Sequence, residues 1–98
     1  MVLLAVLRLK EESYAPGVGK LLEQVGGRRV SRGALYATLE RLEEKGLLRW
    51  RLAGSVPPRG GHRRRRFEIT ASGLAVLRAS RSALLTLWQG LEEVLAER

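Results

Sequence analysis

The spacing of the hydrophobic residues changes at Gly46, and this change limits the folds that the chain can adopt. Before Gly46, apolar residues recur every three or four positions, which is the spacing of one buried helix face. After it, apolar and polar residues alternate over residues 48–52 and again over residues 66–70. Alternation is typical of a strand with one buried face. The sequence therefore predicts helices first and then two short strands.

Three helices are predicted before the change, over residues 2–10, 16–26 and 32–45. Proline suits the first turn of the second helix, where its missing N–H costs nothing. The hydroxyl of Ser31 can accept a hydrogen bond from a free N–H at the start of the third helix. Glycines follow the second and third helices, as expected for helix C-termini.

A loop and a long final helix complete the predicted order. Residues 54–61 contain paired prolines and paired glycines, so they join the two strands as the loop of a β-hairpin. Thr70 or Ser72 can cap the last helix, which is expected to run unbroken to about Ala96. Its seam has residues spaced alternately three and four apart, broken once by an arginine: Leu74, Leu77, Arg81, Leu84, Trp88, Leu91 and Leu95.

Three helices followed by a hairpin is the order of a winged helix-turn-helix. The predicted fold class is mainly α (α+β), with three helices, a two-stranded β-wing and a long C-terminal dimerisation helix. We expect residues 1–70 to form the DNA-binding domain and residues 71–98 the dimerisation helix. A core of 98 residues is small, so a second copy of the chain would add useful buried surface. Leu3 and Leu7 are expected to join the seam in that homodimer interface.

Positive charge is concentrated in the middle of the chain. The chain has 18 Lys and Arg against 10 acidic residues, a net charge of +8. Between Arg28 and Arg66 lie twelve Lys and Arg and three Glu, so this segment alone has a net charge of +9. Double-stranded DNA is the expected partner of such a segment.

The composition argues against catalysis. The chain contains no Cys, Asp or Asn, and His62 is its only histidine. A disulfide, a cysteine zinc site and a multi-histidine metal site are therefore excluded within one chain. We expect no enzyme activity, no metal and no cofactor, and His62 is interpreted as an exposed histidine or a phosphate contact.

The third helix carries the first group of candidate DNA contacts. Its N-terminal end is basic and its C-terminal end is acidic. Recognition helices enter the major groove with the N-terminus first, and free N–H groups at that end attract phosphate. Tyr36 could instead be a core aromatic residue, and Gly33 could be a tolerated glycine rather than a point of close approach to DNA. The candidates here are Arg28, Arg29, Ser31, Arg32, Gly33, Tyr36, Ala37 and Arg41.

The wing carries the second group, Arg63, Arg64, Arg65 and Arg66. They follow two glycines near the hairpin tip, where long cationic side chains can reach a DNA backbone or minor groove. Because neighbouring strand residues point to opposite faces, about two of the four are expected to face DNA. The alternative for this run is a solvated surface or a localisation signal.

Two segments resemble the PadR-like transcriptional regulators. Residues 31–48, SRGALYATLERLEEKGLL, are similar to the recognition helix of that family, and residues 60–73 resemble its wing and the junction with the last helix. Tyr14 matches a tyrosine that the family carries between its first two helices, although Ala15 and Pro16 replace the more usual glycine and polar pair.

The resemblance implies a bacterial or archaeal regulator, usually a repressor, that dimerises through its C-terminal helix. With one helix after the wing, the chain would belong to the short subgroup of the family. Some relatives bind planar aromatic compounds at the dimer interface, so a small-molecule effector is possible. Trp88 could stack on such a compound, but a packing role in the dimer is favoured.

The preferred interpretation is a homodimeric regulator that binds a roughly palindromic operator. The alternative is a non-enzymatic RNA- or ribosome-associated basic protein, although RNA readers usually stack bases on aromatic residues and these are few here. A membrane-surface role fits less well, because the polar face of the last helix is not rich in Lys and Arg. The apolar run 2–7 is too short to be a signal peptide or a membrane span, so a cytoplasmic protein without a membrane partner is expected.

Overall fold

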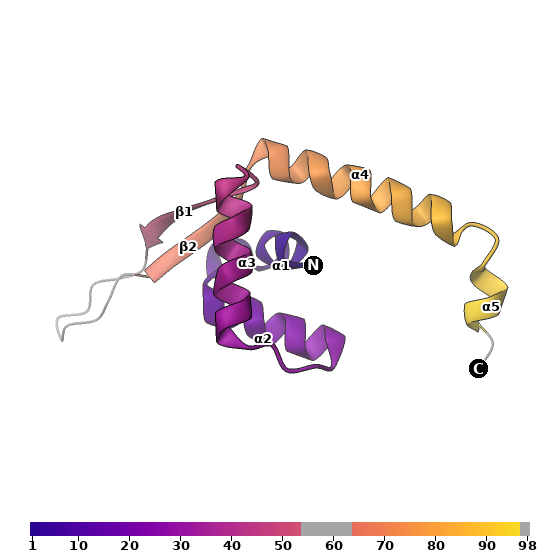
Figure 1. Cartoon of the computed structure of the whole chain (residues 1–98), viewed down its shortest axis with the longest axis horizontal. Helices are drawn as coiled ribbons and strands as arrows, with labels where there is room; N and C mark the ends of the chain where they lie inside the picture. Colours follow the sequence, from indigo (N-terminus) through magenta and orange to yellow (C-terminus); the bar gives the residue numbers. More distant parts are fainter. Residues whose placement is uncertain (54–63, 97–98) are drawn as a thin grey trace.

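The order of helices and strands is the one that the sequence predicts. A computed structural model describes residues 1–53 and 64–96. Figure 1 shows a bundle of three helices with the hairpin projecting from one side and the last long helix leaving from the other. The elements are α1 (Val2–Leu9), the 3-10 turn η1 (Lys10–Glu12), α2 (Ala15–Gly26), α3 (Arg32–Glu44), β1 (Leu48–Ala53), β2 (Arg64–Ile69), α4 (Ala71–Trp88) and α5 (Glu92–Ala96). The predicted winged-helix class, mainly helical with a two-stranded antiparallel sheet, is confirmed.

Local signals in the sequence set the helix ends. Pro16 lies in the first turn of α2, and Gly27 ends that helix in the left-handed conformation with φ 72°. The Ser31 hydroxyl accepts a hydrogen bond from the Ala34 amide (3.1 Å) and so caps α3. Thr70 caps α4 in the same way, since its hydroxyl accepts from the Gly73 amide (3.0 Å).

The core draws one almost fully buried side chain from each of five elements. These are Val6 from α1, Val18 from α2, Leu39 from α3, Leu48 from β1 and Phe67 from β2. Burial of such side chains stabilises a fold by about 1.5–3 kcal/mol each. The three helices and the hairpin therefore form one packed unit, and the wing has a fixed position relative to α3.

The hairpin is tied to the start of α2 by backbone pairing. β1 and β2 are antiparallel, with Leu48 opposite Ile69 and Ala53 opposite Arg64. On its other edge β2 meets the residues before α2: the Phe67 amide donates to the Ser13 carbonyl (2.9 Å), and Tyr14 forms an isolated bridge with Arg66.

The first two turns of α4 pack on the core. Gly73 is buried, and Leu74 and Leu77 are half-buried. The Thr70 hydroxyl donates to the Gly46 carbonyl (2.6 Å). A Cβ atom at Gly73 would collide with the backbone carbonyl of Leu47, so only glycine fits this close approach.

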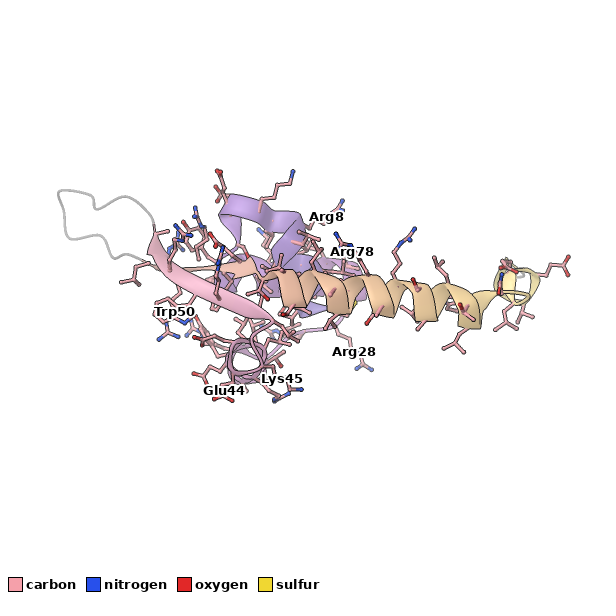
Figure 2. The ribbon with its side chains drawn as sticks, turned by 90° about the horizontal axis from the view of Figure 1, so that it is seen from above. Arg8, Arg28, Glu44, Lys45, Trp50 and Arg78 are labelled. Atoms are coloured by element: carbon pink, nitrogen blue, oxygen red, sulfur yellow. The ribbon has the colours of Figure 1, made fainter. Side chains whose placement is uncertain are left out.

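Beyond this base, α4 extends away from the body, with no other element beside it (Figure 2). Every described residue from Arg78 to Val94 is exposed in the single chain. The prediction of one unbroken helix to Ala96 is wrong. α4 ends at Trp88, Gly90 takes a left-handed φ of 84°, and α5 starts at Glu92 in a new direction. Leu91 therefore lies between α4 and α5, and Leu95 belongs to α5.

The expectation that Leu3 and Leu7 both lie at a dimer interface does not fit the burial of Leu3. Leu3 is packed in the chain's own core with only 7% of its surface exposed, which leaves little of it for a partner. Leu4 and Leu7 are exposed instead. The apolar stripe of α1 thus serves the core on one side and the surface on the other.

We predict that Gly73→Ala destabilises the protein by about 1–3 kcal/mol, because overpacking against backbone cannot be relieved by a rotamer change. Gly33→Ala is the matched control, since a Cβ there meets nothing within 4 Å and alanine favours a helix. Thermal unfolding followed by circular dichroism should show a lower Tm for the first variant only. Equal Tm values for both variants and the wild type would contradict the close packing of α4.

Candidate nucleic-acid interface

The N-terminal half of α3 presents polar and small residues to solvent. Leu35 and Leu39 are buried, while Arg32, Gly33 and Ala37 are exposed. Tyr36 is 37% exposed and does not belong to the core cluster. The interpretation of Tyr36 as a core aromatic residue is therefore wrong.

A hollow of about 380 Å³ joins this part of α3 to the wing and to the start of α2. We call it the interface hollow. Its cationic lining comes from α3 (Arg32) and from β2 (Arg64 and Arg65). The remaining lining residues are Tyr14, Ala15, Pro16, Tyr36 and Phe67. Elements distant in sequence thus bring three arginines and two tyrosines to one concave surface.

Both wing arginines of the interface hollow stack on aromatic rings. The guanidinium carbon of Arg64 lies 4.6 Å from the ring centre of Tyr14, and that of Arg65 lies 4.4 Å from the ring centre of Trp50. A cation over an aromatic face gains about 0.5–1 kcal/mol at an exposed site. Figure 2 shows Trp50 on the side of the hairpin toward α3. The stacking holds two flexible side chains in place before any partner binds.

The opposite surface of the hairpin holds an ion cluster that we call the outer face. It consists of Arg49 and Arg51 from β1 and Arg66 and Glu68 from β2. One carboxylate oxygen of Glu68 accepts from Arg49 (3.0 Å) and Arg51 (3.4 Å), and the other accepts from Arg66 (3.4 Å). None of these four residues lines the interface hollow.

Glu68 is held in its charged form. The hydrogen bond from Arg49 lowers the pKa of the Glu68 carboxyl below its usual value, and the positive charges of Arg51, Arg49 and Arg66 lower it further. Desolvation acts in the opposite direction and is outweighed. Because the pKa is lowered, the contribution of this cluster to stability is complete above the usual carboxyl pKa and is lost only as the pH falls through the lowered value.

The other candidate residues that the structure describes do not line the interface hollow. Arg28 and Arg29 are exposed between α2 and α3, and Arg41 is exposed on the later half of α3. Arg66 is half-buried and pairs with Glu68. Arg63 lies outside the described residues. The two wing arginines that line the hollow, Arg64 and Arg65, are neighbours in the sequence. Both can line it because their long side chains stack on different rings.

Sequence reasoning missed the aromatic residues that position these arginines. Tyr14 was identified only through the family resemblance, and Trp50 only as an apolar strand residue. The strand register indicates the contact between Trp50 and Arg65. Trp50 pairs with Phe67 across the hairpin, and Arg65 lies two residues before Phe67 on the same face.

The described residues offer no metal site, since no group of three His, Cys or Glu side chains there could hold an ion. Within residues 1–53 and 64–96, no helix combines the length and hydropathy needed to cross a bilayer.

A three-helix bundle, a basic helix N-terminus and a basic hairpin that share one hollow define a winged-helix DNA-binding protein. The model of the PadR-like family of transcriptional regulators matches residues 3–79, and the chain belongs to this family. It is therefore a DNA-binding regulator of transcription. No curated protein is significantly similar to the chain in sequence.

Solved structures of the same family share the fold over almost the whole chain. A PadR family transcriptional regulator from Eggerthella lenta is 28% identical, with a TM-score of 0.72 over 99% of this chain and 82% of the other. A PadR-like regulator from Bacillus cereus has a TM-score of 0.75 at 21% identity and covers 99% and 92% of the two chains. A PadR family regulator from Clostridium difficile has a TM-score of 0.67 at 22% identity and covers 96% and 92%.

We predict that Tyr14→Leu weakens duplex binding about two- to fivefold, because Arg64 loses the ring on which it stacks. Tyr14→Phe keeps the ring and removes only the hydroxyl, so it should bind like the wild type. Fluorescence anisotropy with a labelled duplex measures both. If the phenylalanine variant were as weak as the leucine variant, the hydroxyl and not the stacking would be the important feature.

Proposed function

We propose that the chain is a homodimeric repressor that binds a roughly palindromic operator in the cytoplasm and blocks access of the transcription machinery. The observation that carries this proposal is the interface hollow, which is lined by Arg32 of α3 together with Arg64 and Arg65 of the wing. A helix N-terminus and a hairpin that share one basic surface can contact the major groove and the neighbouring backbone of the same duplex. Each protomer of a twofold dimer would then read one half-site.

The two elements should have different tasks. Arg32 lies in the first turn of α3, from which a side chain can reach a base edge. Arginine can bond O6 and N7 of guanine together and discriminate between bases by about 1–3 kcal/mol. Arg64 and Arg65 stack on rings at the edge of the hairpin, so we assign them to phosphate or the minor groove. The helix would supply specificity and the wing affinity.

We predict that Arg32→Ala relaxes sequence preference at one position in each half-site. A double variant, Arg64→Ala with Arg65→Ala, should weaken specific and non-specific duplexes alike, and should flatten the log–log salt dependence by about one unit per lost contact. Selection from random duplex DNA first supplies the operator, and a salt series on that duplex and a scrambled one measures both effects. Loss of specificity in the wing variant, with only lower affinity in Arg32→Ala, would reverse the assignment.

The proposed dimer interface is the exposed part of α4. Arg81 is exposed midway along the helix, and the last two turns expose Leu84, Leu85, Leu87 and Trp88, of which Leu87 is 71% exposed. This apolar surface is wider than the seam that the sequence predicts. An isolated helix with so much exposed apolar surface would be a liability, so a second copy is the occupant that we propose. In this arrangement Trp88 is a packing residue.

A second apolar surface lies between α1 and α2 and fits the same partner. A hollow of about 780 Å³ there has exposed Leu4, Leu7 and Val25 in its lining, with Arg8 and Lys10 also present. The α5 helix of a second copy carries Glu92 and Glu93 in its first turn, and these carboxylates complement the two cations. This surface gives the expected role of Leu7 in the dimer a physical basis.

We predict that Leu84→Gln combined with Trp88→Gln shifts the protein from dimer to monomer, because the interface loses apolar contact at two exposed residues of α4. Thr86→Gln is the control, since residue 86 lies on the opposite side of α4 from Leu84. Sedimentation velocity measures the mass, and circular dichroism verifies that the variants are folded. A doubly substituted protein that stayed a folded dimer would exclude this surface.

A further inference from the structure

The outer face of the hairpin is an anion site that the chain fills with its own carboxylate. Three guanidinium groups, from Arg49, Arg51 and Arg66, converge on Glu68 at 3.0 to 3.4 Å. Arg51 lies directly opposite Arg66 across the two strands, an arrangement of like charges that is unfavourable without a counter-charge. A DNA phosphate presents the same acceptor chemistry to arginine as a carboxylate does.

The cluster differs from an ordinary surface ion pair in its accessibility. The side chains of Arg49 and Arg51 are 67% and 61% exposed, so both can reach a phosphate once they are released. Glu68 is only 25% exposed and sits within the cluster. None of the four residues lines the interface hollow, so a duplex bound to the outer face would not contact Arg32 through that hollow.

We propose that Glu68 is a specificity-determining residue that competes with DNA phosphate for the outer-face arginines. By engaging Arg49, Arg51 and Arg66, it suppresses binding of duplex through the outer face. Binding through the interface hollow, where α3 reads the sequence, is thereby favoured over non-specific binding. This inference rests on the proposed function.

One carboxylate is enough to engage all three outer-face arginines. Non-specific binding depends on the number of phosphates that cations neutralise, and each released guanidinium adds one potential contact. Glu68 engages three guanidinium groups at once, whereas Arg64 and Arg65 are stacked on rings and keep their N–H groups available. Arg65 lies on the face of Trp50, opposite the cluster, whereas Arg64 lies at the end of the cluster's own face and stacks on Tyr14 instead of pairing with Glu68.

The test compares Glu68→Gln with Glu44→Gln. Both remove one negative charge, but Glu44 is exposed at the end of α3 and has no ion pair within the described residues. The probes are the duplex selected by the wild type and a scrambled duplex of the same length. Glu68→Gln should bind the scrambled duplex about three- to tenfold more tightly, with a salt slope steeper by about one unit. Its preference for the selected duplex should fall, while Glu44→Gln changes either affinity less than about twofold.

A second pair of variants keeps the proposal testable if Glu68→Gln fails to fold. In the presence of Glu68, Arg49→Gln with Arg51→Gln should change affinity for the scrambled duplex by less than about twofold, because both arginines are already engaged. A slope flatter by about two units in that variant would show that the arginines contact DNA in the wild type and would overturn the proposal.

The proposed function and the proposed role of Glu68 are tested separately. If the wild type selects no duplex sequence, the proposed function is wrong. If the wild type is selective but Glu68→Gln and Glu44→Gln behave alike, Glu68 is no competitor and only this inference is wrong.

Discussion

The amide of Phe67 donates to the carbonyl of Ser13, and the bridge between Tyr14 and Arg66 continues this pairing. These contacts fix the hairpin to the start of α2. They add to the core contacts of Leu48 and Phe67, and they bring Arg64 close to the ring of Tyr14. The interface hollow exists because the pairing brings β2, the start of α2 and the N-terminal half of α3 together. In the proposed function, DNA binding therefore depends on the backbone pairing between residues 13–14 and residues 66–67.

The hairpin divides its charge between two surfaces. On the edge near α3, aromatic rings orient arginines and leave their donors available, whereas on the outer face a carboxylate engages them. Both arrangements keep long side chains ordered before a partner arrives, which lowers the entropic cost of binding. A strongly basic protein must discriminate between its operator and a large excess of other DNA. The distribution of the arginines matters for this more than their number.

The sequence predicts most of the fold because its signals are local. The cap at Ser31, the left-handed Gly27 and the alternation after Gly46 each act within a few residues. The break near Gly90 was missed because the heptad spacing on both sides of it outweighed one glycine. Spacing also could not tell whether Leu3 or Leu7 faces the chain's own core, since both are apolar. The cluster around Glu68 requires the strand register, which alternation alone leaves undefined in steps of two residues.

Amide chemical shifts of the protein, titrated with the duplex that it selects, report which surface contacts DNA. We expect the changes in shift to concentrate in three places: the first two turns of α3, the segment around Tyr14, and Arg64 with Arg65. Amides of Glu43 and Glu44, at the acidic end of α3, should change little, and so should those of Arg49 and Glu68 on the outer face. Shifts concentrated on the outer face, with none at Arg32 or Tyr36, would contradict DNA reading through the interface hollow.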